Sequence, residues 1–454
     1  MNLDNVNKVF FLGIGGIGMS ALARYFLFLG KEVYGYDKTP TKLTKELEKE
    51  GANIHFEDDV ALLPEGIDIV VYTPAIPKDH KEFNYFKKNK FNLYKRSQIL
   101  GEISKNYFTI AVAGTHGKTT TSGMIAHFLT ECGVPIVGFL GGIIKNFNSN
   151  FVIHPNAKVL VTEADEFDRS FLTLHPNIAI ITSLDPDHLD IYGSKEEMVK
   201  SYREFALQVK EKIILHKSVE EDLVTIKNVS SYSTNTNNAE VTSANIRVEN
   251  GKQVFDIING FEKIENIKCG LPGKHNIENA IGAFIATNQY VKNPEKVAKA
   301  IETYKGVVRR FDVHYQSSKT IYIDDYAHHP REIQALVNSV KELYPNKKIT
   351  GIFQPHLFSR TRDFADDFAE SLSLLDELIM LEIYPAREQS IPGVTSSFVL
   401  EKVAIYEKQI VPMEKVLDYI KEKEFEVLLT IGAGNIDQLI DPIKNMLQLA
   451  YEEN

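Results

Sequence analysis

One segment of the sequence carries the groups that hold nucleotide phosphates. It runs Gly114-Thr115-His116-Gly117-Lys118-Thr119-Thr120, after the mostly apolar stretch 109–113 and before a helical pattern. Its backbone amides and the following helix end can surround phosphates, Lys118 supplies a point charge, and Thr119 offers a hydroxyl to magnesium. The segment resembles a P-loop that is two residues shorter than the common pattern. A turn without a ligand is the alternative, but the flanking strand and helix favour an ATP site.

Two groups of acidic residues supply the hard oxygen donors that magnesium prefers. Glu163-Ala-Asp165-Glu166-Phe-Asp168 follows the strand-like stretch 159–162, and Asp185-Pro-Asp187-His188-Leu-Asp190 follows the stretch 178–182. In open α/β sheets ligands bind at the carboxyl ends of strands, which is where both groups fall. Each group alone is also typical of a helix cap or a turn. Their position downstream of the Lys118 segment favours a metal site.

A glycine loop near the N-terminus predicts a second phosphate site. Gly13-Ile14-Gly15-Gly16-Ile17-Gly18 follows the strand-like run 9–12 and precedes a helical pattern. Such a loop brings backbone amides and a helix N-terminus close to a diphosphate. Asp37 ends the next strand-like run, where a dinucleotide fold places an acid against a ribose hydroxyl. A tight turn without a ligand is the alternative, and the loop does not encode which nucleotide binds.

The elements around these segments predict an α/β protein of three domains. A length of 454 residues fits two or three domains. Strand, glycine turn and helix occur at the start of the chain and again at 109–120, and a third set of apolar runs alternates with helical patterns after residue 320. We expect domains at 1–105, 106–306 and 307–454. Short alternating runs between 217 and 270, with Asn250-Gly251 as a hairpin turn, predict a β-rich insertion in the middle domain.

Composition limits the kinds of partner that the protein can have. Lys and Arg number 51 against 61 Asp and Glu, so the net charge of -10 argues against a surface for nucleic acid. Cys132 and Cys269 lie far apart and have no metal-ligand spacing, which fits a reducing compartment. The N-terminus lacks the pattern of a signal peptide, and no stretch has the length of a transmembrane helix. We therefore expect a soluble, cytoplasmic protein.

Nine ordered motifs resemble a known family. They are GIGGIGMSALA, AGTHGKTTT, TEADEFDRSF, DPDHLDIY, GKHNIENA, VVRRFD, DDYAHHPREI, QPHLFSRTRD and GAGNID. In this order and at this spacing they are similar to the ATP-dependent Mur ligases of peptidoglycan synthesis, over almost the whole chain. The resemblance is closest to the branch that joins L-alanine to UDP-N-acetylmuramate. It implies an N-terminal Rossmann-like domain for the UDP-sugar, a central ATPase domain with a mostly parallel sheet, and a C-terminal Rossmann-like domain for the amino acid.

The resemblance also implies roles for individual residues. Thr119 and Glu163 would hold one magnesium ion and His188 a second, while Lys118 and Arg310 would approach the ATP phosphates. The glycine loop with Ile17 and Asp37 would bind the UDP-sugar. The adenosine would meet His275, Asn276, Asn279 and either Asp324 or Asp325. The amino-acid pocket would contain Tyr326, His328, His356 and Arg360.

Several of these roles have alternatives in the sequence itself. His275 also fits beside a helix cap, Arg360 fits a solvated helix face, and the His328-His329 pair fits a packed turn. Arg360 nevertheless suits a substrate carboxylate, because its planar guanidinium can bind both oxygens. In the reaction that the resemblance implies, the amino group of L-alanine attacks the activated carboxylate and loses a proton. His328, His356 or an ordered water would accept that proton.

Two positions depart from the pattern of the relatives. Leu357 stands where the family often has an arginine directly after the histidine of QPH, which removes one expected basic contact. Ala206 stands where ligases for later amino acids carry a lysine modified to a carbamate, if the alignment around SYREFA holds. That second departure suits the alanine-adding branch.

Three other functions remain open from the sequence. A sister ligase that attaches a recycled peptide to the same sugar shares the architecture. A nicotinamide-dependent oxidoreductase is suggested by the first glycine loop alone, but it leaves the Lys118 segment and the acidic groups without a task. A nucleotide-sensing regulator needs the Lys118 segment without the substrate motifs. The sequence is compatible with a monomer or a homodimer.

Overall fold

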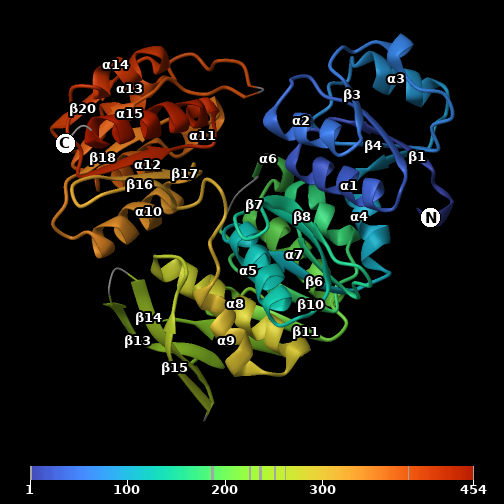
Figure 1. The fold of residues 1–454 in the computed structure, drawn as a ribbon, viewed down its shortest axis with the longest axis horizontal. Coiled ribbons are helices and arrows are strands. Elements are labelled where there is room, and N and C mark those ends of the chain that lie inside the picture. Colours follow the sequence, from blue (N-terminus) through green and yellow to red (C-terminus); the bar gives the residue numbers. More distant parts are fainter. Residues whose placement is uncertain are drawn as a thin grey trace. The chain divides into compact units, whose positions relative to one another are not determined.

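The chain builds three β-sheets flanked by helices (Figure 1). The computed structural model describes residues 3–185, 189–223, 226–234, 238–249, 252–260, 262–386 and 388–452. The chain divides into two compact units, each of which has most of its contacts within itself. Unit 1 comprises Met1–Ile246, Phe255–Lys268 and Glu278–Lys305, and unit 2 comprises Arg247–Val254, Cys269–Ile277 and Gly306–Asn454. The domain boundaries near 105 and 307 stay predictions.

The first sheet has the strand order β3-β2-β1-β4-β5, and all its pairs are parallel. Helices cover a parallel sheet on both faces, so its central strand contains a continuous apolar run, which here is Val9 to Leu12. Successive strands are added on one side of β1 as far as β3 and then on its other side from β4, and ligands of a Rossmann-like fold bind at such a switch point between β1 and β4. The strands are β1 (Lys8–Leu12), β2 (Glu32–Tyr36), β3 (Asn53–His55), β4 (Ile69–Tyr72) and β5 (Leu93–Lys95). The helices are η1 (Leu3–Asn5), α1 (Ile17–Phe28), α2 (Lys42–Lys49), η2 (Val60–Leu62), α3 (Lys81–Lys88) and α4 (Arg96–Ser104).

The second sheet has ten strands in the order β15-β14-β13-β12-β11-β10-β6-β9-β7-β8. Its strands are β6 (Phe108–Ala113), β7 (Ile136–Ile144), β8 (Ser149–Ile153), β9 (Val159–Glu163), β10 (Ile178–Ile181), β11 (Lys212–His216), β12 (Val229–Ser233), β13 (Val241–Glu249), β14 (Lys252–Asn259) and β15 (Glu262–Lys268). Its helices are α5 (Lys118–Glu131), η3 (Phe167–Thr173), α6 (Leu189–Tyr192), α7 (Lys195–Leu207), η4 (Lys217–Val219), α8 (Lys274–Val291) and α9 (Pro294–Glu302). The expected β-rich insertion supplies β12 to β15, which extend this sheet. Asn250 and Gly251 lie outside the described residues.

The third sheet has the order β16-β17-β21-β18-β19-β20. The sequence predicts a parallel unit, and one edge differs: β16 runs antiparallel to β17. The turn at 317–319 joins these strands directly, whereas a parallel pair requires a long crossover. The strands are β16 (Asp312–Gln316), β17 (Ile321–Asp325), β18 (Ile349–Phe353), β19 (Glu377–Met380), β20 (Glu407–Ile410) and β21 (Val427–Ile431). The helices are α10 (Pro330–Leu343), α11 (Phe358–Asp363), α12 (Ala365–Leu372), α13 (Ser396–Leu400), η5 (Met413–Lys415), α14 (Val416–Ile420), η6 (Asn435–Leu439) and α15 (Ile440–Glu452).

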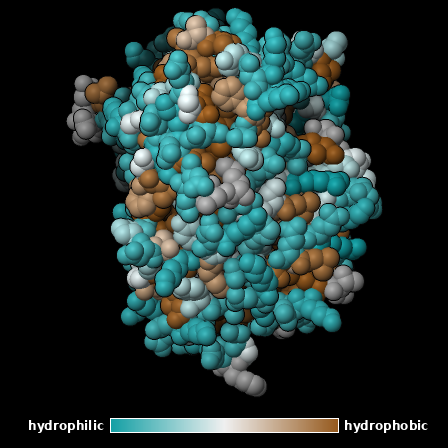
Figure 2. Space-filling view, turned by 90° about the vertical axis from the view of Figure 1, so that its right-hand side faces the viewer, coloured by the Kyte–Doolittle hydropathy of each residue, from teal (hydrophilic) through white to brown (hydrophobic). Residues whose placement is uncertain are grey.

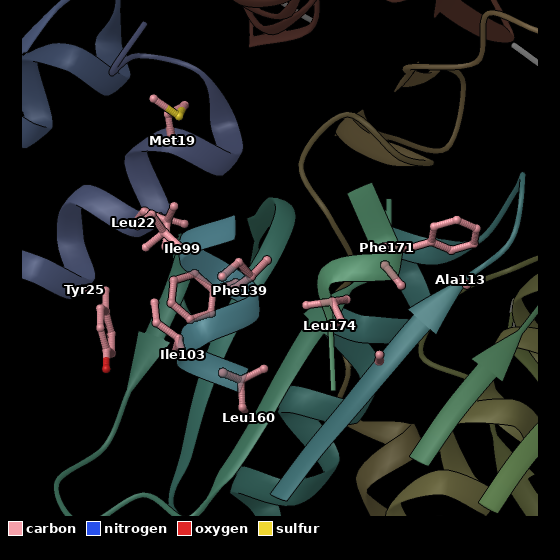
Figure 3. Close-up of a cluster of buried hydrophobic side chains, with 14 of the residues drawn as sticks. Met19, Leu22, Tyr25, Ile99, Ile103, Ala113, Phe139, Leu160, Phe171 and Leu174 are labelled. Atoms are coloured by element: carbon pink, nitrogen blue, oxygen red, sulfur yellow. The ribbon is translucent and has the colours of Figure 1, made fainter. Parts of the chain in front are cut away.

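The first and second sheets of unit 1 share one continuous hydrophobic core. Figure 3 shows side chains of α1 and α4, such as Tyr25 and Ile103, beside Phe139 of β7. The ring centroids of Tyr25 and Phe139 are 5.7 Å apart. At the edge of this contact Arg24, which is 9% exposed, is bonded to Glu50 at 2.8 Å and to Asn150 of β8. Helix α1, which follows the glycine loop, is therefore packed against the second sheet.

The face shown in Figure 2 is mostly hydrophilic, and its apolar residues lie in separate small areas. In the described part of the chain, no helix combines the length and the apolar character that a membrane crossing requires.

Candidate active site

The segment 114–120 joins β6 to α5 through two glycines with positive φ. Gly114 has φ +127° and Gly117, the N-cap of α5, has φ +82°. A Cβ on Gly114 would lie 2.1 Å from Thr182 Oγ1, and a Cβ on Gly117 would lie 2.6 Å from Asn279 Oδ1. Both positions therefore need glycine for conformation and for space. The first helical amides of α5 face the loop, which is the arrangement of an anion site.

Lys118 sits in this loop with its charge already paired. Its Nζ donates to Glu166 Oε1 at 2.8 Å and to Gly114 O at 2.6 Å. Burial opposes the charged form of Lys118, but the nearby carboxylates of Glu166 and Asp165 outweigh it and raise the pKa of the lysine. Lys118 is therefore a cation at neutral pH, and its ammonium group is paired with Glu166.

Three loops of the second sheet meet because their strands are neighbours. β6 pairs in parallel with β9 on one side and with β10 on the other. Their carboxyl ends therefore bring together the Lys118 segment, Glu163 and residues 183–185, as the sequence predicts. Thr115 N donates to Ser183 O at 3.2 Å, and Thr115 Oγ1 donates to Asp185 O at 2.8 Å.

Glu163 and Thr119 are the predicted ligands of the first magnesium ion. Both offer oxygen, which is the ligand atom that Mg²⁺ prefers. Gly141 N donates to Glu163 Oε1 at 3.1 Å, and a Cβ on Gly141 would lie 2.3 Å from that oxygen. Gly141 thus makes the space that the Glu163 carboxylate occupies. The predicted second metal ligand, His188, lies outside the described residues.

The acidic segment after β9 is tied to the first sheet by two cations that the sequence analysis missed. Arg96 Nη2 donates to Asp165 Oδ2 at 3.1 Å, and Lys95 Nζ donates to Asp168 Oδ2 at 2.5 Å. A Cβ on Gly18 would lie 2.5 Å from Arg96 Nη1, so the guanidinium lies directly against the glycine loop. The only sequence signal was a basic pair at the end of a strand, which is too common to single out.

The glycine loop of the first sheet is closed by Asp37. Gly15 N donates to Asp37 Oδ2 at 2.7 Å, and a Cβ on Gly15 would lie 2.8 Å from that oxygen. Gly13 has φ +83°, and a Cβ there would lie 2.9 Å from Thr73 Cγ2. The expected acid is therefore at the loop, but it accepts from a loop amide in addition to any ribose contact.

The three residues expected at the adenosine have different surroundings. Asn279 Oδ1 accepts from Thr121 Oγ1 at 3.2 Å and lies against Gly117. Asn276 is buried, and its Nδ2 donates to Pro272 O at 2.6 Å, which closes the turn before α8. A Cβ on Gly273 would lie 2.6 Å from His275 Cε1, so this glycine makes room for the His275 ring.

In unit 2 the expected amino-acid residues gather at the ends of β17 and β18. The ring centroids of Tyr326 and His328 are 5.4 Å apart, and those of His328 and His356 are 6.1 Å apart. His356 also stacks on Tyr384 at 5.7 Å. Arg360 is the third residue of α11, and its charge lowers the pKa of His328. The structure therefore brings Tyr326, His328, His356 and Arg360 together.

The imidazole of His328 is held by its own loop. Nδ1 contacts Tyr326 O at 3.0 Å, and the backbone N–H of His328 donates to Glu332 Oε2 at 3.0 Å. Burial lowers the pKa of His328, Arg360 lowers it further, and Glu332 opposes both. The ring is therefore neutral at pH 7, and a bond from Nδ1–H to the carbonyl leaves Nε2 able to accept a proton.

The two arginines of VVRRFD differ in their contacts, and so do the two aspartates of DDY. Arg309 Nε donates to Asp324 Oδ2 at 3.1 Å, and Thr430 Oγ1 donates to Asp324 Oδ1 at 2.7 Å. Asp324 is fully buried and both of its carboxylate oxygens are bonded within unit 2. That Asp324 or Asp325 meets the ribose stays a prediction. Arg310 is one-third exposed and lies 5.8 Å from the Tyr326 ring.

Asp325 is the aspartate that remains at the loop. It accepts from Phe311 N at 2.6 Å and from Ala327 N at 2.8 Å. Burial raises the pKa of Asp325 to about 6, with Arg310 and these two bonds opposing the rise.

The two departures from the family pattern also have structural contexts. Leu357 is the N-cap of α11 and has φ +71°, a conformation that costs a non-glycine residue about 1–3 kcal/mol. Its N–H donates to Tyr384 O at 3.0 Å and its carbonyl accepts from Thr361 Oγ1 at 2.7 Å, which holds the turn. Ala206 is buried on α7 within the core of unit 1.

Comparisons with known proteins agree along the whole chain. The Mur ligase family catalytic domain matches residues 8–108, the Mur ligase middle domain matches 112–287, and the Mur ligase glutamate ligase domain matches 309–434. A UDP-N-acetylmuramate–L-alanine ligase from Flavobacterium psychrophilum is 48% identical over 451 residues, covering 98% of this chain and 99% of the relative. One from Parabacteroides distasonis is 49% identical over 456 residues, covering 98% of both chains.

Solved structures show the same fold. The UDP-N-acetylmuramate-alanine ligase of Thermotoga maritima has a TM-score of 0.85 at 27% identity, over 98% of this chain and 99% of that one. A murein peptide ligase of Psychrobacter arcticus has a TM-score of 0.72 at 22% identity, over 97% and 98% of the two chains. The fold and the site define an ATP-dependent ligase of the three-domain α/β class. The chain belongs to the Mur ligase family.

Proposed function

We propose that this chain joins L-alanine to the carboxylate of UDP-N-acetylmuramate and converts ATP to ADP and phosphate. The observation that carries this proposal is the 48–49% identity, over nearly the full length, to relatives named for that reaction. The meeting of the Lys118 segment with Glu163 at the ends of β6 and β9 supports the ATP-dependent step. The reaction is a cytoplasmic step of peptidoglycan precursor synthesis.

The chemistry explains why ATP is needed. A carboxylate has no adequate leaving group, so the γ-phosphoryl group of ATP is first transferred to it to form an acyl phosphate. Lys118 neutralises charge on the transferring group. During this transfer, Lys118 Nζ donates hydrogen bonds to phosphate oxygens in place of the Glu166 carboxylate. Arg310 is our candidate for a second cation at the γ-phosphate, since Arg309 is committed to Asp324.

Magnesium fits the residues beside Lys118. Thr119 Oγ1 and the Glu163 carboxylate would hold it, and His188 would hold a second ion. When bound, such ions neutralise phosphate charge and orient the phosphate oxygens. The phosphates also accept hydrogen bonds from backbone and side-chain donors of the same segment, which are those of Gly114, Thr115, His116, Gly117 and Thr120. His275, Asn279 and Asp325 remain candidates for the adenosine.

The amine of L-alanine then attacks the acyl phosphate. The tetrahedral intermediate expels phosphate and leaves the amide. Arg360 binds the alanine carboxylate with two parallel bonds, and neutral His328 accepts the amine proton at Nε2. Tyr326 and His356 line the same pocket through their ring contacts. The UDP diphosphate binds at Gly13, Gly15, Gly16, Ile17 and Gly18, with Asp37 closing the loop.

The direct test is phosphate release by the purified protein with magnesium, ATP and UDP-N-acetylmuramate. L-alanine is compared with no amine and with the tripeptide that a recycling ligase would use. We expect release to depend on both the UDP-sugar and L-alanine. Phosphate release with the tripeptide but not with L-alanine would assign the sister function. If no phosphate is released with either amine, the ligase proposal is refuted.

A further inference from the structure

The helix that carries Arg360 is too short to hold its own first turn. α11 has six residues, and the first amides of a helix have no partner within it. Leu357 is the N-cap of α11, and a leucine side chain has no oxygen that can accept from those amides. With φ +71°, Leu357 also has a backbone conformation that non-glycine residues rarely adopt. The start of α11 therefore depends on groups outside the helix.

Glu388 caps those amides from another part of unit 2. Its Oε2 accepts from the backbone N–H of Ser359 at 3.0 Å, and its Oε1 accepts from Ser359 Oγ. The backbone N–H of Phe358 donates to the same carboxylate. A carboxylate beside the first turn of a helix is also attracted by the positive end of the helix dipole. Glu388 thus supplies the acceptor that Leu357 lacks.

The carboxylate of Glu388 is charged at neutral pH. Burial raises its pKa, but the bonds from Ser359 and Phe358 outweigh burial and lower the pKa below its usual value. The nearby His356 acts in the same direction. A charged carboxylate accepts stronger hydrogen bonds than a neutral amide, so a glutamine at this position would hold the helix less firmly.

Tyr384 holds the residues that precede α11. Its backbone forms a parallel β-bridge with His356, and Leu357 N–H donates to Tyr384 O at 3.0 Å. Glu388 N–H donates at 2.8 Å to the carbonyl of Pro385, which is next to Tyr384. The same short part of the chain therefore holds both sides of the Leu357 turn.

The GAGNID motif, which the proposed reaction does not use, fixes Tyr384 against the sheet. A Cβ on Gly434 would lie 2.8 Å from Tyr384 Cβ and 2.3 Å from Gln354 Oε1, so this position has room only for glycine. Gln354 Oε1 accepts from Ile436 N–H at 3.0 Å, and Gln354 Nε2 donates to Asn435 Oδ1 at 2.8 Å. Because the motif follows β21, the support of α11 reaches back to a central strand of the third sheet.

We propose that Glu388 is a positioning residue for the amino-acid substrate. It fixes the first turn of α11, and with it Arg360 and His356, in the orientation that binds this substrate. The proposal rests on the proposed function, in which Arg360 binds the alanine carboxylate. Because the guanidinium bonds both carboxylate oxygens at once, a small rotation of α11 removes one of the two bonds. Glu388 acts through Arg360 and requires no contact with the substrate.

Steady-state phosphate release tests the proposal by comparing the unchanged protein with Glu388→Gln. The variant should raise KM for L-alanine about tenfold, because Arg360 is no longer held in place. KM for ATP and KM for UDP-N-acetylmuramate should each stay within about twofold, whereas a general folding defect would change all three.

Hydrogen exchange followed by mass spectrometry gives a readout that needs no turnover. The amides of residues 357–363 should exchange about tenfold faster in Glu388→Gln than in the unchanged protein, because the first turn of α11 opens more often. The amides of α10 should keep their exchange rates.

Glu382→Gln is the matched control, because Glu382 is exposed, lies two residues before Tyr384 and loses the same charge. It should change neither KM nor exchange. Ser359→Ala removes one bond to Glu388 and should raise KM for L-alanine about threefold. Combined with Glu388→Gln it should add little, because both variants break the same contact. Circular dichroism checks folding, and Ser359→Ala decides the question if Glu388→Gln does not fold.

The outcomes separate this proposal from the proposed function. If the unchanged protein uses the tripeptide in place of L-alanine, the proposed function is wrong, and the same comparison is made with KM for the tripeptide. A folded Glu388→Gln variant with an unchanged KM for the amine, or with unchanged exchange in α11, would overturn the positioning role.

Discussion

At the scale of single residues, the cation of the Lys118 segment forms a buried ion pair. Lys118 and Glu166 are 2.8 Å apart, and Glu166 is almost fully buried. If Lys118 binds ATP phosphates as proposed, those phosphates compete with Glu166 for its ammonium group, and the Lys118–Glu166 pair has to break when they bind.

Replacing Glu166 by Gln should reduce the stability of the ligand-free protein and increase the stabilisation by ATP. The amide keeps an acceptor for Lys118 but leaves the buried charge uncompensated, at a cost of about 1–3 kcal/mol. Thermal unfolding with and without an ATP analogue and magnesium measures both effects. Glu102→Gln, which breaks an exposed pair with Lys105 on α4, is the control and should change little. Equal melting temperatures for the unchanged protein and Glu166→Gln would contradict the prediction.

His328 sets the acidic limit of the proposed reaction. Burial and Arg360 lower its pKa below the usual 6.5, so activity should fall only when the pH drops through that lowered value. Glu332 opposes the shift, and therefore Glu332→Gln should move the acidic limb to lower pH. The pH profile of kcat/KM for alanine measures it. Glu342→Gln, near the other end of α10, should leave the limb unmoved.

At the scale of elements, α5 has glycines with positive φ at both ends and only one of them faces the site. Gly117 begins the helix at φ +82°, and Gly133 follows its C-terminus at φ +77°. A Cβ on Gly133 meets nothing within 4 Å, whereas one on Gly117 meets Asn279. The two positions separate conformational cost from steric cost.

Gly117→Ala should abolish ATP binding, whereas Gly133→Ala should cost only about 1 kcal/mol of stability. The alanine at 117 forces either Asn279 or the loop amides to move, and the phosphates lose their donors. Isothermal titration with an ATP analogue and thermal unfolding of both variants separate the effects. Normal ATP affinity in Gly117→Ala would show that the loop does not bind the nucleotide.

At the scale of the whole molecule, ion pairs link the first sheet of unit 1 to the acidic segment of the second. Arg96 and Lys95 come from α4 and β5, and their partners Asp165 and Asp168 follow the strand that ends in Glu163. Asp168 and Arg169 have φ +52° and +54°, so this segment is held in a strained conformation. The glycine loop 13–18 and the acidic segment after β9 are thereby positioned together.

Arg96→Ala should raise KM for UDP-N-acetylmuramate and lower kcat, with kcat/KM reduced at least tenfold. The guanidinium lies against Gly18 and also fixes Asp165, so both the sugar site and the acidic segment lose support. Steady-state phosphate release measures this. Lys105→Ala at the C-cap of the same helix removes only a solvent-accessible pair with Glu102 and should leave the kinetics unchanged. Loss of activity in both variants would indicate a general fault in α4.

Much of the site was predictable because its loops are local in sequence. Glycines at 13 and 114 followed by a helical pattern specify a strand, a turn and a helix, because positive φ is open to glycine and closed to most other residues. Acids directly after apolar runs fall at strand ends for the same local reason. The resemblance to a family then supplied roles that the residues alone left open.

The sequence by itself determined the three α/β sheets, the phosphate loops and the acidic groups at strand ends. Only the tertiary structure decided which strands are neighbours. It also decided that Asp324 pairs with Arg309, and that Arg96 pairs with Asp165, which is 69 positions away in the sequence. Backbone conformation depends on adjacent residues, which a sequence displays directly. Pairing between distant charges depends on how buried surfaces pack, and many pairings are compatible with the same local pattern.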